Sequence, residues 1–517
     1  MRAEYVLRSR TLLFAAPHTL TLSCYVIIAQ NNMMLGNCFS LMVLLNQDFI
    51  NSIAKDMPAH LTMDDFIHYS SQPLRPSIRV NTLKISSNDF IDLMKPKGWT
   101  LDPIPWCSDG FWVSLDSEIQ LGNTIEHIQG LFYIQEASSM LPPTALFDGL
   151  DDTAEYTILD MASAPGSKTT QIAALMKNSG LIVANEYSSS RVKVLHANVL
   201  RMGVSNTALT HFDARVFGEY LFNQFDAILL DAPCSGEGTI RKDPQALKNW
   251  SHAENASIID TQKALIESAF LALKTGGSLV YSTCALSRAE NQEVCEHLMS
   301  CFPDAVEFQS LSQLFPDAEK SCTSEGFLHV WPQVYDSEGF FIAKIRKITD
   351  IERQKPMPKQ QKNFPFEPAS TKVKVELQRY FKDTFDISLP HDGLVMVRDL
   401  EYWLFPAKMA DLIGKMRFQR IGIKLADGLK KGFKVRHEAI MALANALTPY
   451  ELTSLQATEY LMGRDIPLPD GGKPQGEVIL TYHGCALGVA KHLGKKLKNS
   501  LPRELVRDRI ISSETKV

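Results

Sequence analysis

Two cysteines occupy positions from which they could carry out covalent chemistry. Cys234 lies in the segment DAPCSGEG (231–238), directly after the apolar run 225–230, and Cys284 follows the apolar run 278–282. If both runs are strands of one parallel sheet, their carboxyl ends bring the two thiols to the same edge of that sheet. A lone buried cysteine is usually only a small apolar side chain. Two cysteines at neighbouring strand ends instead indicate a reactive site.

The chemistry that such thiols support is addition to an electron-poor pyrimidine. A thiolate that adds to C6 makes C5 electron-rich, so that C5 can displace the methyl group of a sulfonium donor, which divides one difficult step into easier ones. The adduct must then lose the C5 proton and expel the sulfur, which gives the second cysteine a role. Asp231 can hydrogen-bond the N3 edge of a cytosine and favour addition. The residues alone leave open which cysteine is the nucleophile.

A loop of small residues predicts the cofactor site. It follows the strand predicted at 156–161 and precedes the helix predicted at 170–176, and in open α/β sheets ligands bind at such junctions. A dinucleotide loop would have the pattern G-x-G-x-x-G, whereas this loop has one glycine, which disfavours NAD. The loop consists of Ala162, Ser163, Ala164, Pro165, Gly166, Ser167 and Lys168.

Two further acids follow the next two predicted strands. Glu186 ends the strand 181–185, where a carboxylate can accept both hydroxyls of a ribose. Asp213 follows the strand 207–212 and could meet an adenine amino group. Each acid alone reads more simply as a helix cap or a surface charge, but acids at successive strand ends, without a phosphate cradle, indicate a nucleoside ligand. We therefore expect S-adenosylmethionine as the cofactor.

These motifs resemble those of the Nop/Sun family of RNA cytosine-C5 methyltransferases. The resemblance rests on 162–168, 231–236 and 283–284, with Glu186 and Asp213 between them, and extends over roughly 41–509. Four further segments are similar to a bacterial branch of the family that acts on small-subunit ribosomal RNA: 133–140, 211–213, 241–244 and 497–507.

The resemblance implies a Rossmann-like methyltransferase fold and a ribosomal RNA substrate. It implies cofactor contacts at 162–168, Glu186, Asp213 and Asp231, with Cys284 as nucleophile and Cys234 in product release. DNA cytosine methyltransferases place the nucleophile in their Pro-Cys motif instead, so the resemblance alone decides for Cys284. The alternatives are methylation of transfer RNA and a non-catalytic RNA-binding assembly factor, and the intact cysteines and acids argue against the latter.

Composition limits the class of protein. The 517 residues predict several domains, and 45% hydrophobic with 21% charged residues is typical of folded globular proteins. A net charge of -5 argues against a uniformly basic nucleic-acid binder, although a sum over several domains can hide a basic face. Nine cysteines without a CxxC pair predict neither a metal site nor a disulfide framework. We expect a cytoplasmic monomer with reduced thiols, no metal and no membrane partner.

Alternating strand-like and helix-like segments from 156 to 347 predict an α/β domain with a parallel sheet covered on both faces. A PUA-like RNA-binding domain is implied by the resemblance, with a hairpin predicted around Gly484. Basic clusters support an RNA grip there, because 408–436 holds nine Lys or Arg against two acids and 491–509 holds seven against two. The predicted organisation is an extension at 1–40, an N-terminal α/β appendage at 41–146, the catalytic domain at 147–347, a linker at 348–370, a small domain at 371–420 and the PUA-like domain at 421–509.

Residues 1–40 fit neither the folded pattern nor the resemblance. Basic residues precede an apolar run at 11–29, as in a targeting segment, but Pro17 and His18 interrupt this run. It therefore falls short of the ~20 apolar residues that a membrane span needs. We interpret the segment as a non-native start or a disordered extension.

We predict that deletion of residues 1–38 leaves methyl transfer and solubility unchanged, because no motif of the site lies there. The measurement compares turnover and the soluble fraction of the shortened and full-length proteins. A shortened protein that loses activity or changes compartment contradicts the interpretation.

Overall fold

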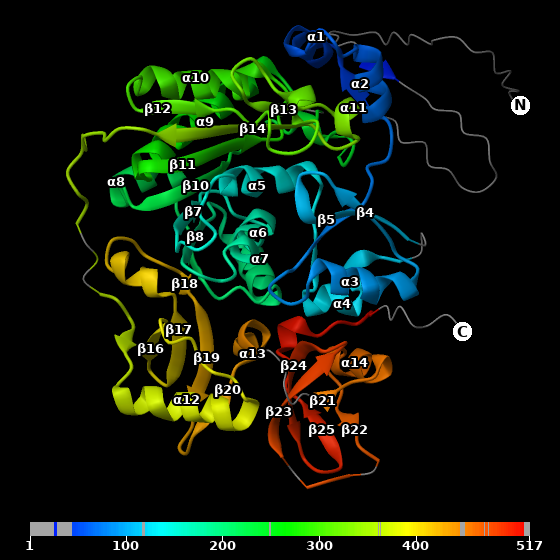
Figure 1. The fold of residues 1–517 in the computed structure, drawn as a ribbon, viewed down its shortest axis with the longest axis vertical. Coiled ribbons are helices and arrows are strands. Elements are labelled where there is room, and N and C mark those ends of the chain that lie inside the picture. The colour runs from blue at the N-terminus through cyan, green and yellow to red at the C-terminus, as the bar shows by residue number, and fades with distance from the viewer. Residues whose placement is uncertain are drawn as a thin grey trace, which may run out of the picture.

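The computed structural model describes residues 25–27 and 44–510, with short gaps at 116–118, 244, 248–249, 360, 362, 445–449, 470 and 474. Figure 1 shows a central α/β domain in cyan and green, with the N-terminal segment in blue beside it and two smaller units in yellow and red below. Of the predicted extension, only β1 (Tyr25–Ile27) is described, and it pairs with β2 (Leu44–Asn46). The rest of residues 1–40 lies outside the described residues.

Five parallel strands form the centre of the largest sheet, which confirms the predicted architecture. β7 and β8 are buried along their whole length, as expected for strands that are covered on both faces. The five strands are β7 (Thr157–Asp160), β8 (Leu181–Asn185), β9 (Thr207–Thr210), β10 (Phe225–Asp231) and β11 (Leu273–Thr283).

Antiparallel strands that the sequence did not predict extend this sheet at both edges. β14 runs antiparallel to β11, and both β12 and β13 pair with β14. At the other edge β18, which lies beyond the predicted linker, pairs with β9. The order is β12-β14-β11-β10-β7-β8-β9-β18. The added strands are β12 (Val306–Gln309), β13 (Leu328–Val330), β14 (Phe340–Lys347) and β18 (Arg420–Ile421).

Helices cover both faces of the sheet, because successive strand residues point in opposite directions. Ile158 shares an apolar cluster with Ile172 of α6, whereas its neighbour Leu159 shares another with Phe270 of α9. One face carries α5 (Leu141–Phe147), α6 (Ser167–Leu175) and α7 (Ser189–Arg201), and the other carries α8 (Phe217–Tyr220), α9 (His252–Ala272) and α10 (Gln292–Cys301). No helix among the described residues is long and apolar enough to cross a membrane.

The strand order creates a crevice at the carboxyl edge of the sheet. The chain builds β7, β8 and β9 outward in one direction and then returns to the other side of β7 to build β10. In open α/β sheets, ligands bind where the strand order reverses in this way. The loop after β7 and the end of β10 therefore flank the expected binding site.

The N-terminal module has its own four-stranded sheet, in the order β4-β5-β3-β6. Thr62 caps α2 by accepting a hydrogen bond from the backbone N–H of Asp65. The elements are α1 (Gln47–Asp56), α2 (Met63–Ser70), β3 (Ser77–Val80), α3 (Ser87–Met94), β4 (Thr100–Ile104), β5 (Cys107–Ser114), α4 (Ile125–Gln129) and β6 (Phe132–Ile134). The short helix α11 (Pro332–Tyr335) of the catalytic domain contacts α2.

The module after the catalytic domain crosses the boundary predicted at residue 420. β17 and β19 lie on opposite sides of that residue and pair with each other in one five-stranded sheet. We therefore propose that the boundary lies after α13. The module comprises β15 (Glu367–Pro368), α12 (Thr371–Phe385), β16 (Leu394–Arg398), β17 (Glu401–Phe405), β19 (Ile423–Gly428), β20 (Phe433–Val435) and α13 (His437–Leu443).

The last module is a second five-stranded sheet that contains the predicted hairpin. β23 and β24 pair around His483 and Gly484, which both have positive φ angles of 52° and 70°, as a type I′ turn requires. The elements are β21 (Tyr450–Glu451), α14 (Ser454–Leu461), β22 (Ile466–Pro467), β23 (Gly476–Tyr482), β24 (Cys485–His492) and β25 (Lys496–Asn499).

A buried arginine joins the N-terminal module to the catalytic domain. The Arg79 guanidinium, on β3, donates hydrogen bonds to Gln135 Oε1 at 2.6 Å, to the Ser167 carbonyl at 2.7 Å and to Thr170 Oγ1 at 2.8 Å. Ser167 and Thr170 belong to α6, directly after the cofactor loop. Arg79 therefore fixes the start of the helix that carries Lys168.

We predict that Arg79→Ala lowers the free energy of unfolding by about 3 kcal/mol, because it leaves several buried acceptors without a donor. Urea unfolding measures the change. Arg346→Ala, which removes an exposed arginine from β14, is the matched control and should have little effect. Equal stability of the two variants would show that Arg79 does not hold the modules together.

Candidate active site

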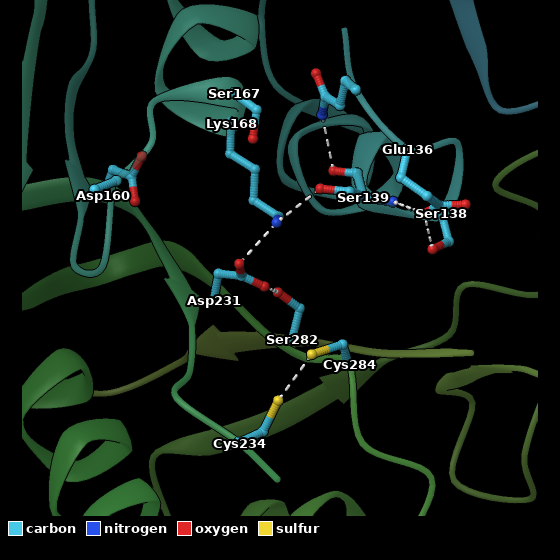
Figure 2. Close-up of polar contacts among 12 residues, drawn as sticks. Glu136, Ser138, Ser139, Asp160, Ser167, Lys168, Asp231, Cys234, Ser282 and Cys284 are labelled. Carbon is cyan, nitrogen blue, oxygen red and sulfur yellow. Dashed lines mark hydrogen bonds and ion pairs between the residues drawn. The ribbon is translucent and has the colours of Figure 1, made fainter. Parts of the chain in front are cut away.

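The two cysteines meet at the carboxyl ends of β10 and β11. These strands are parallel neighbours with Asp231 opposite Ser282, so the residues that follow them enter the same space. The sulfur atoms of Cys234 and Cys284 lie 3.0 Å apart, and Figure 2 shows them facing each other below Asp231. Both side chains are half-buried. The structure thus brings together the two thiols that the sequence singled out.

Close backbone contacts fix the loop of each cysteine. The N–H of Gly238 donates a hydrogen bond to the Cys284 carbonyl at 2.7 Å. A Cβ atom at Gly238 would lie 2.2 Å from the Gly339 carbonyl oxygen and 2.8 Å from the Cys284 carbonyl oxygen, so only glycine fits. The second glycine of the DAPCSGEG segment therefore permits the approach of the two loops.

Glu237 is a structural acid that the sequence analysis did not identify. Its side chain is fully buried, and one oxygen accepts hydrogen bonds from the backbone N–H groups of Leu286 and Ser287, each at 2.9 Å. The other oxygen accepts from Trp250 Nε1 at 2.7 Å. Glu237 therefore holds the chain just after Cys284. A charged residue between two glycines was the only sequence signal of this role.

The environment of Cys234 favours its protonated form. The hydrogen bond with Cys284, together with burial, raises the pKa of the Cys234 thiol well above its ordinary value, and the nearby Glu290 carboxylate acts in the same direction. Glu290 is itself buried and accepts hydrogen bonds from the Ser235 N–H at 3.0 Å and from Gln262 at 2.9 Å. Either sulfur can donate the hydrogen bond that joins the two thiols.

Lys168 links the cofactor loop to the catalytic strand. Its ammonium group donates hydrogen bonds to Asp231 Oδ2 at 2.7 Å and to Ser139 Oγ at 2.9 Å. The Ser282 hydroxyl donates to the other Asp231 oxygen at 2.8 Å. Figure 2 shows Lys168 reaching down from α6 to Asp231, directly above the cysteines. The carboxylate of Asp231 is therefore held on both oxygens, by a cation and by a hydroxyl.

The predicted cofactor loop lies between the end of β7 and the start of α6. Gly166 precedes α6 with a φ angle of 108°, and a Cβ there would lie 3.1 Å from Leu195 Cδ1. The Ser163 hydroxyl donates to the Asp160 carbonyl at 2.8 Å, and Arg191 donates to the Ala164 carbonyl at 2.5 Å. These contacts hold the loop open along the crevice.

Glu186 and Asp213 differ in how free their carboxylates are. Glu186 is buried at the end of β8, where it accepts the Ser188 N–H at 2.8 Å and lies 3.5 Å from the guanidinium of Arg191. Asp213 lies beyond β9 and is a third exposed, and its two oxygens bind the guanidinium of Arg215, which lowers the pKa of Asp213. Both acids thus follow adjacent strands as predicted, but Glu186 is the better placed to receive a ligand hydroxyl.

A further buried acid, Asp160, was missed by the sequence analysis. Burial raises its pKa to about 6, although the Thr169 hydroxyl donates to one oxygen at 2.6 Å. Its other oxygen is buried and has no partner among the described residues. Asp160 thus offers an unsatisfied acceptor at the end of β7, and Glu186 offers a buried carboxylate at the end of β8. These acceptors fit S-adenosylmethionine, which offers an amino group and two ribose hydroxyls as donors.

The fold and this site define a Rossmann-like methyltransferase. Comparison with known proteins identifies the family. The chain belongs to the family of ribosomal RNA small subunit methyltransferase F: it is 84% identical to that protein of Shewanella woodyi over 475 residues, which cover 92% of this chain and 99% of the relative. It is 79% identical to that of Shewanella sediminis over 473 residues, which cover 92% and 99%. The resemblance to the Nop/Sun family is therefore confirmed, and the family uses S-adenosylmethionine, as expected.

Family models match four successive parts of the chain. They describe the N-terminal domain of 16S rRNA methyltransferase RsmF at 45–137, 16S rRNA methyltransferase RsmB/F at 149–346, the pre-PUA domain of ribosomal RNA small subunit methyltransferase F at 366–443 and the methyltransferase RsmF PUA domain at 448–507. Among solved structures, the crystal structure of PH0851 matches with a TM-score of 0.53 and 28% identity, over 58% of this chain and 65% of that one.

We predict that Glu186→Gln raises the Kd for S-adenosylmethionine by about 10- to 100-fold, because a charged acceptor for the ribose hydroxyls is lost. Isothermal titration calorimetry measures the affinity. Asp213→Asn is the comparison variant and should have a smaller effect, since Arg215 already occupies that carboxylate. Equal losses in the two variants, or none in either, would remove Glu186 from the cofactor site.

Proposed function

We propose that this chain methylates C5 of a cytosine in 16S ribosomal RNA, with Cys284 as the nucleophile, Asp231 as the group that orients the base and Cys234 as the thiol that assists release. The observation that carries the proposal is the pair of sulfur atoms 3.0 Å apart beside the Lys168–Asp231 ion pair. Family membership supports the substrate, because the model matched by the catalytic domain is that of 16S rRNA methyltransferases. Members of the family are RNA cytosine-C5 methyltransferases.

The Lys168–Asp231 pair offers a complementary edge for cytosine. The base presents O2 and N3 as acceptors and its amino group as a donor, whereas the pair presents ammonium N–H groups beside carboxylate oxygens. Lys168 uses two of its three N–H groups within the protein, which leaves one for the base. A hydrogen bond to N3 or O2 withdraws electrons from the ring and favours attack at C6. Asp231 acts as an ionised acceptor for the amino group in this arrangement.

Addition forms a bond between the Cys284 sulfur and C6. Cys284 attacks as the thiolate, the form in which a cysteine sulfur is nucleophilic. The electron pair of the C5–C6 double bond then becomes available at C5. When bound, S-adenosylmethionine supplies the electrophilic methyl group. The chain's contribution is to hold Lys168 and Asp231 against the base while C5 is electron-rich.

Release reverses the addition. A base removes the proton from C5, the C5–C6 double bond re-forms, and the C6–S electron pair returns to Cys284. The Cys234 thiol faces this sulfur and stabilises its departure by hydrogen bonding to it. This contact therefore acts at the release step. This division of labour gives each cysteine a different step.

Only some of the basic residues in the C-terminal clusters are free to bind RNA phosphates, because others are paired with acids. Within 408–436, Arg420 pairs with Glu438, Lys424 pairs with Glu401 and Asp427, and Arg436 pairs with Asp427. By contrast, three lysines at the turn and second strand of the β19–β20 hairpin are exposed and have no acidic partner among the described residues: Lys430, Lys431 and Lys434. We propose that these exposed lysines contact RNA phosphates, that the protein acts on RNA as a monomer and that it works in the cytoplasm.

We predict that Cys284→Ala abolishes both methyl transfer and adduct formation, whereas Cys234→Ala still adds and methylates but then stalls. The physical reason is that addition precedes elimination, so a thiol that acts only in release cannot matter earlier. The two variants are incubated with cofactor and substrate RNA and run on a denaturing gel. The Cys234 variant should show a slowly migrating protein–RNA band that the Cys284 variant lacks.

The double variant and Cys295→Ala complete this experiment. The double variant should form no band, and Cys295→Ala, which alters a buried cysteine of α10 outside the site, should turn over like the parent protein. A band that appears with Cys284→Ala and vanishes with Cys234→Ala would exchange the two roles. If the parent protein and all variants are folded but show neither activity nor an adduct, the result would instead support the alternative of a non-catalytic RNA-binding assembly factor.

A further inference from the structure

A cavity of about 730 Å³ lies where the four modules of the chain meet, and neither the cysteines nor the cofactor loop lines it, although Asn198 of its wall donates a hydrogen bond to the Pro165 carbonyl at 2.9 Å. Its wall includes His127 from α4 of the N-terminal module, Arg201 from the end of α7 of the catalytic domain, Arg420 from β18 and Arg507 from the C-terminal segment. None of these residues has a part in the proposed reaction. The proposed reaction therefore gives this cavity no role.

Two arginines of the wall, Arg201 and Arg507, form no ion pair with a carboxylate among the described residues. The Arg201 guanidinium donates hydrogen bonds to the carbonyls of His127 at 2.7 Å and Phe132 at 3.2 Å, and to the side chain of Asn198. That of Arg507 donates only to the carbonyls of Glu504 and Val506. Burial, with a smaller contribution from the positive charge of Arg507, lowers the pKa of Arg201 to about 10.

The same two charges act on His127. Burial lowers the pKa of His127 to about 3, and both Arg201 and Arg507 contribute to the lowering. The imidazole is thus neutral at neutral pH and adds no third charge. Arg201 and Arg507 come from different modules and line the same cavity. An anion bound between them would offset the repulsion of their two positive charges, so the cavity suits a shared anion.

A second observation points to a ligand in the cavity. His196 and Arg420 line it, and one nitrogen of each side chain, His196 Nε2 and Arg420 Nε, is buried without a hydrogen-bond partner among the described residues. Two of the cavity's carboxylates are already occupied, since Glu401 binds Lys424 and Glu438 binds Arg420. The exposed Glu504 is the remaining acid, against the unpaired cations Arg201, Arg507 and Lys193. The balance of free charge is positive.

We propose that Arg201 and Arg507 bind one phosphate group of the RNA backbone in this cavity, at a site separate from the catalytic pocket. A phosphate offers several oxygen acceptors to two guanidinium groups and matches the fork of their N–H donors. The occupant is taken to be RNA because of the proposed function, whereas the anion site itself stands on the arginines. Because the two arginines come from the catalytic domain and the C-terminal segment, a phosphate between them also ties these modules together.

The test compares Arg507→Gln with Arg509→Gln, an exposed arginine of the same segment that does not line the cavity. Fluorescence anisotropy measures the affinity for substrate RNA over a range of salt concentrations. Arg507→Gln should raise the Kd roughly tenfold and reduce the slope of log K against log salt by about 0.7 to 0.9, the value for one phosphate contact. Arg507→Lys should restore the slope, because it restores the charge. Identical curves for Arg507→Gln and Arg509→Gln would overturn the proposal.

Two further readouts separate this site from the catalytic one and from a site for free phosphate. At saturating RNA, Arg507→Gln should still bind S-adenosylmethionine and form product at the parent rate. A loss of both would mean that Arg507 acts in folding or in the reaction, and would overturn its assignment to RNA binding. Inorganic phosphate without RNA should raise the melting temperature of the parent protein more than that of Arg507→Gln. A phosphate effect on melting with unchanged RNA binding would assign the cavity to a free anion and overturn the RNA proposal.

Discussion

β10 and β11 lie side by side as parallel strands, with Asp231 opposite Ser282, and the chemistry of the site depends on this pairing. Asp231 ends β10 and Cys234 follows three residues later, whereas Cys284 directly follows Thr283, the last residue of β11. A slip of one residue would turn alternate side chains to the opposite face of the sheet and separate the sulfur atoms. The hydrogen bond from Gly238 to the Cys284 carbonyl locks the two loops in the same register.

Buried carboxylates maintain this geometry at a cost in stability. Glu237 and Glu290 are both fully buried, and burial raises the pKa of Glu237. Each accepts several hydrogen bonds from backbone or side-chain donors around the cysteines, which offsets part of the loss of hydration. Apolar residues of similar volume would pack as well. They could not fix the backbone N–H groups that position the chain on both sides of the thiol pair.

Local patterns in the sequence predict what lies along one strand or one loop, but not which distant segments pair. The apolar run 181–185 matches β8, and Asp231 and the two thiols lie at the same edge of the sheet because parallel strands share one edge. β14 and β18 were missed, since short apolar segments do not encode their antiparallel partners. The boundary predicted at residue 420 falls between β17 and β19, which pair in one sheet, and we propose a later boundary. Glu237 was missed because a buried acid and a solvated acid look the same in a sequence. The roles of the site residues remain proposals.

The central claim is that Cys284, and not Cys234, bonds to the base. The most direct measurement uses substrate RNA in which the target cytidine carries fluorine at C5, because the methylated adduct then has no proton to lose and cannot eliminate. After digestion of the trapped complex with nuclease and protease, mass spectrometry identifies the peptide that carries the modified nucleotide. The account predicts a methylated fluorocytidine on the peptide that contains Cys284. The same nucleotide on the peptide that contains Cys234 would contradict it.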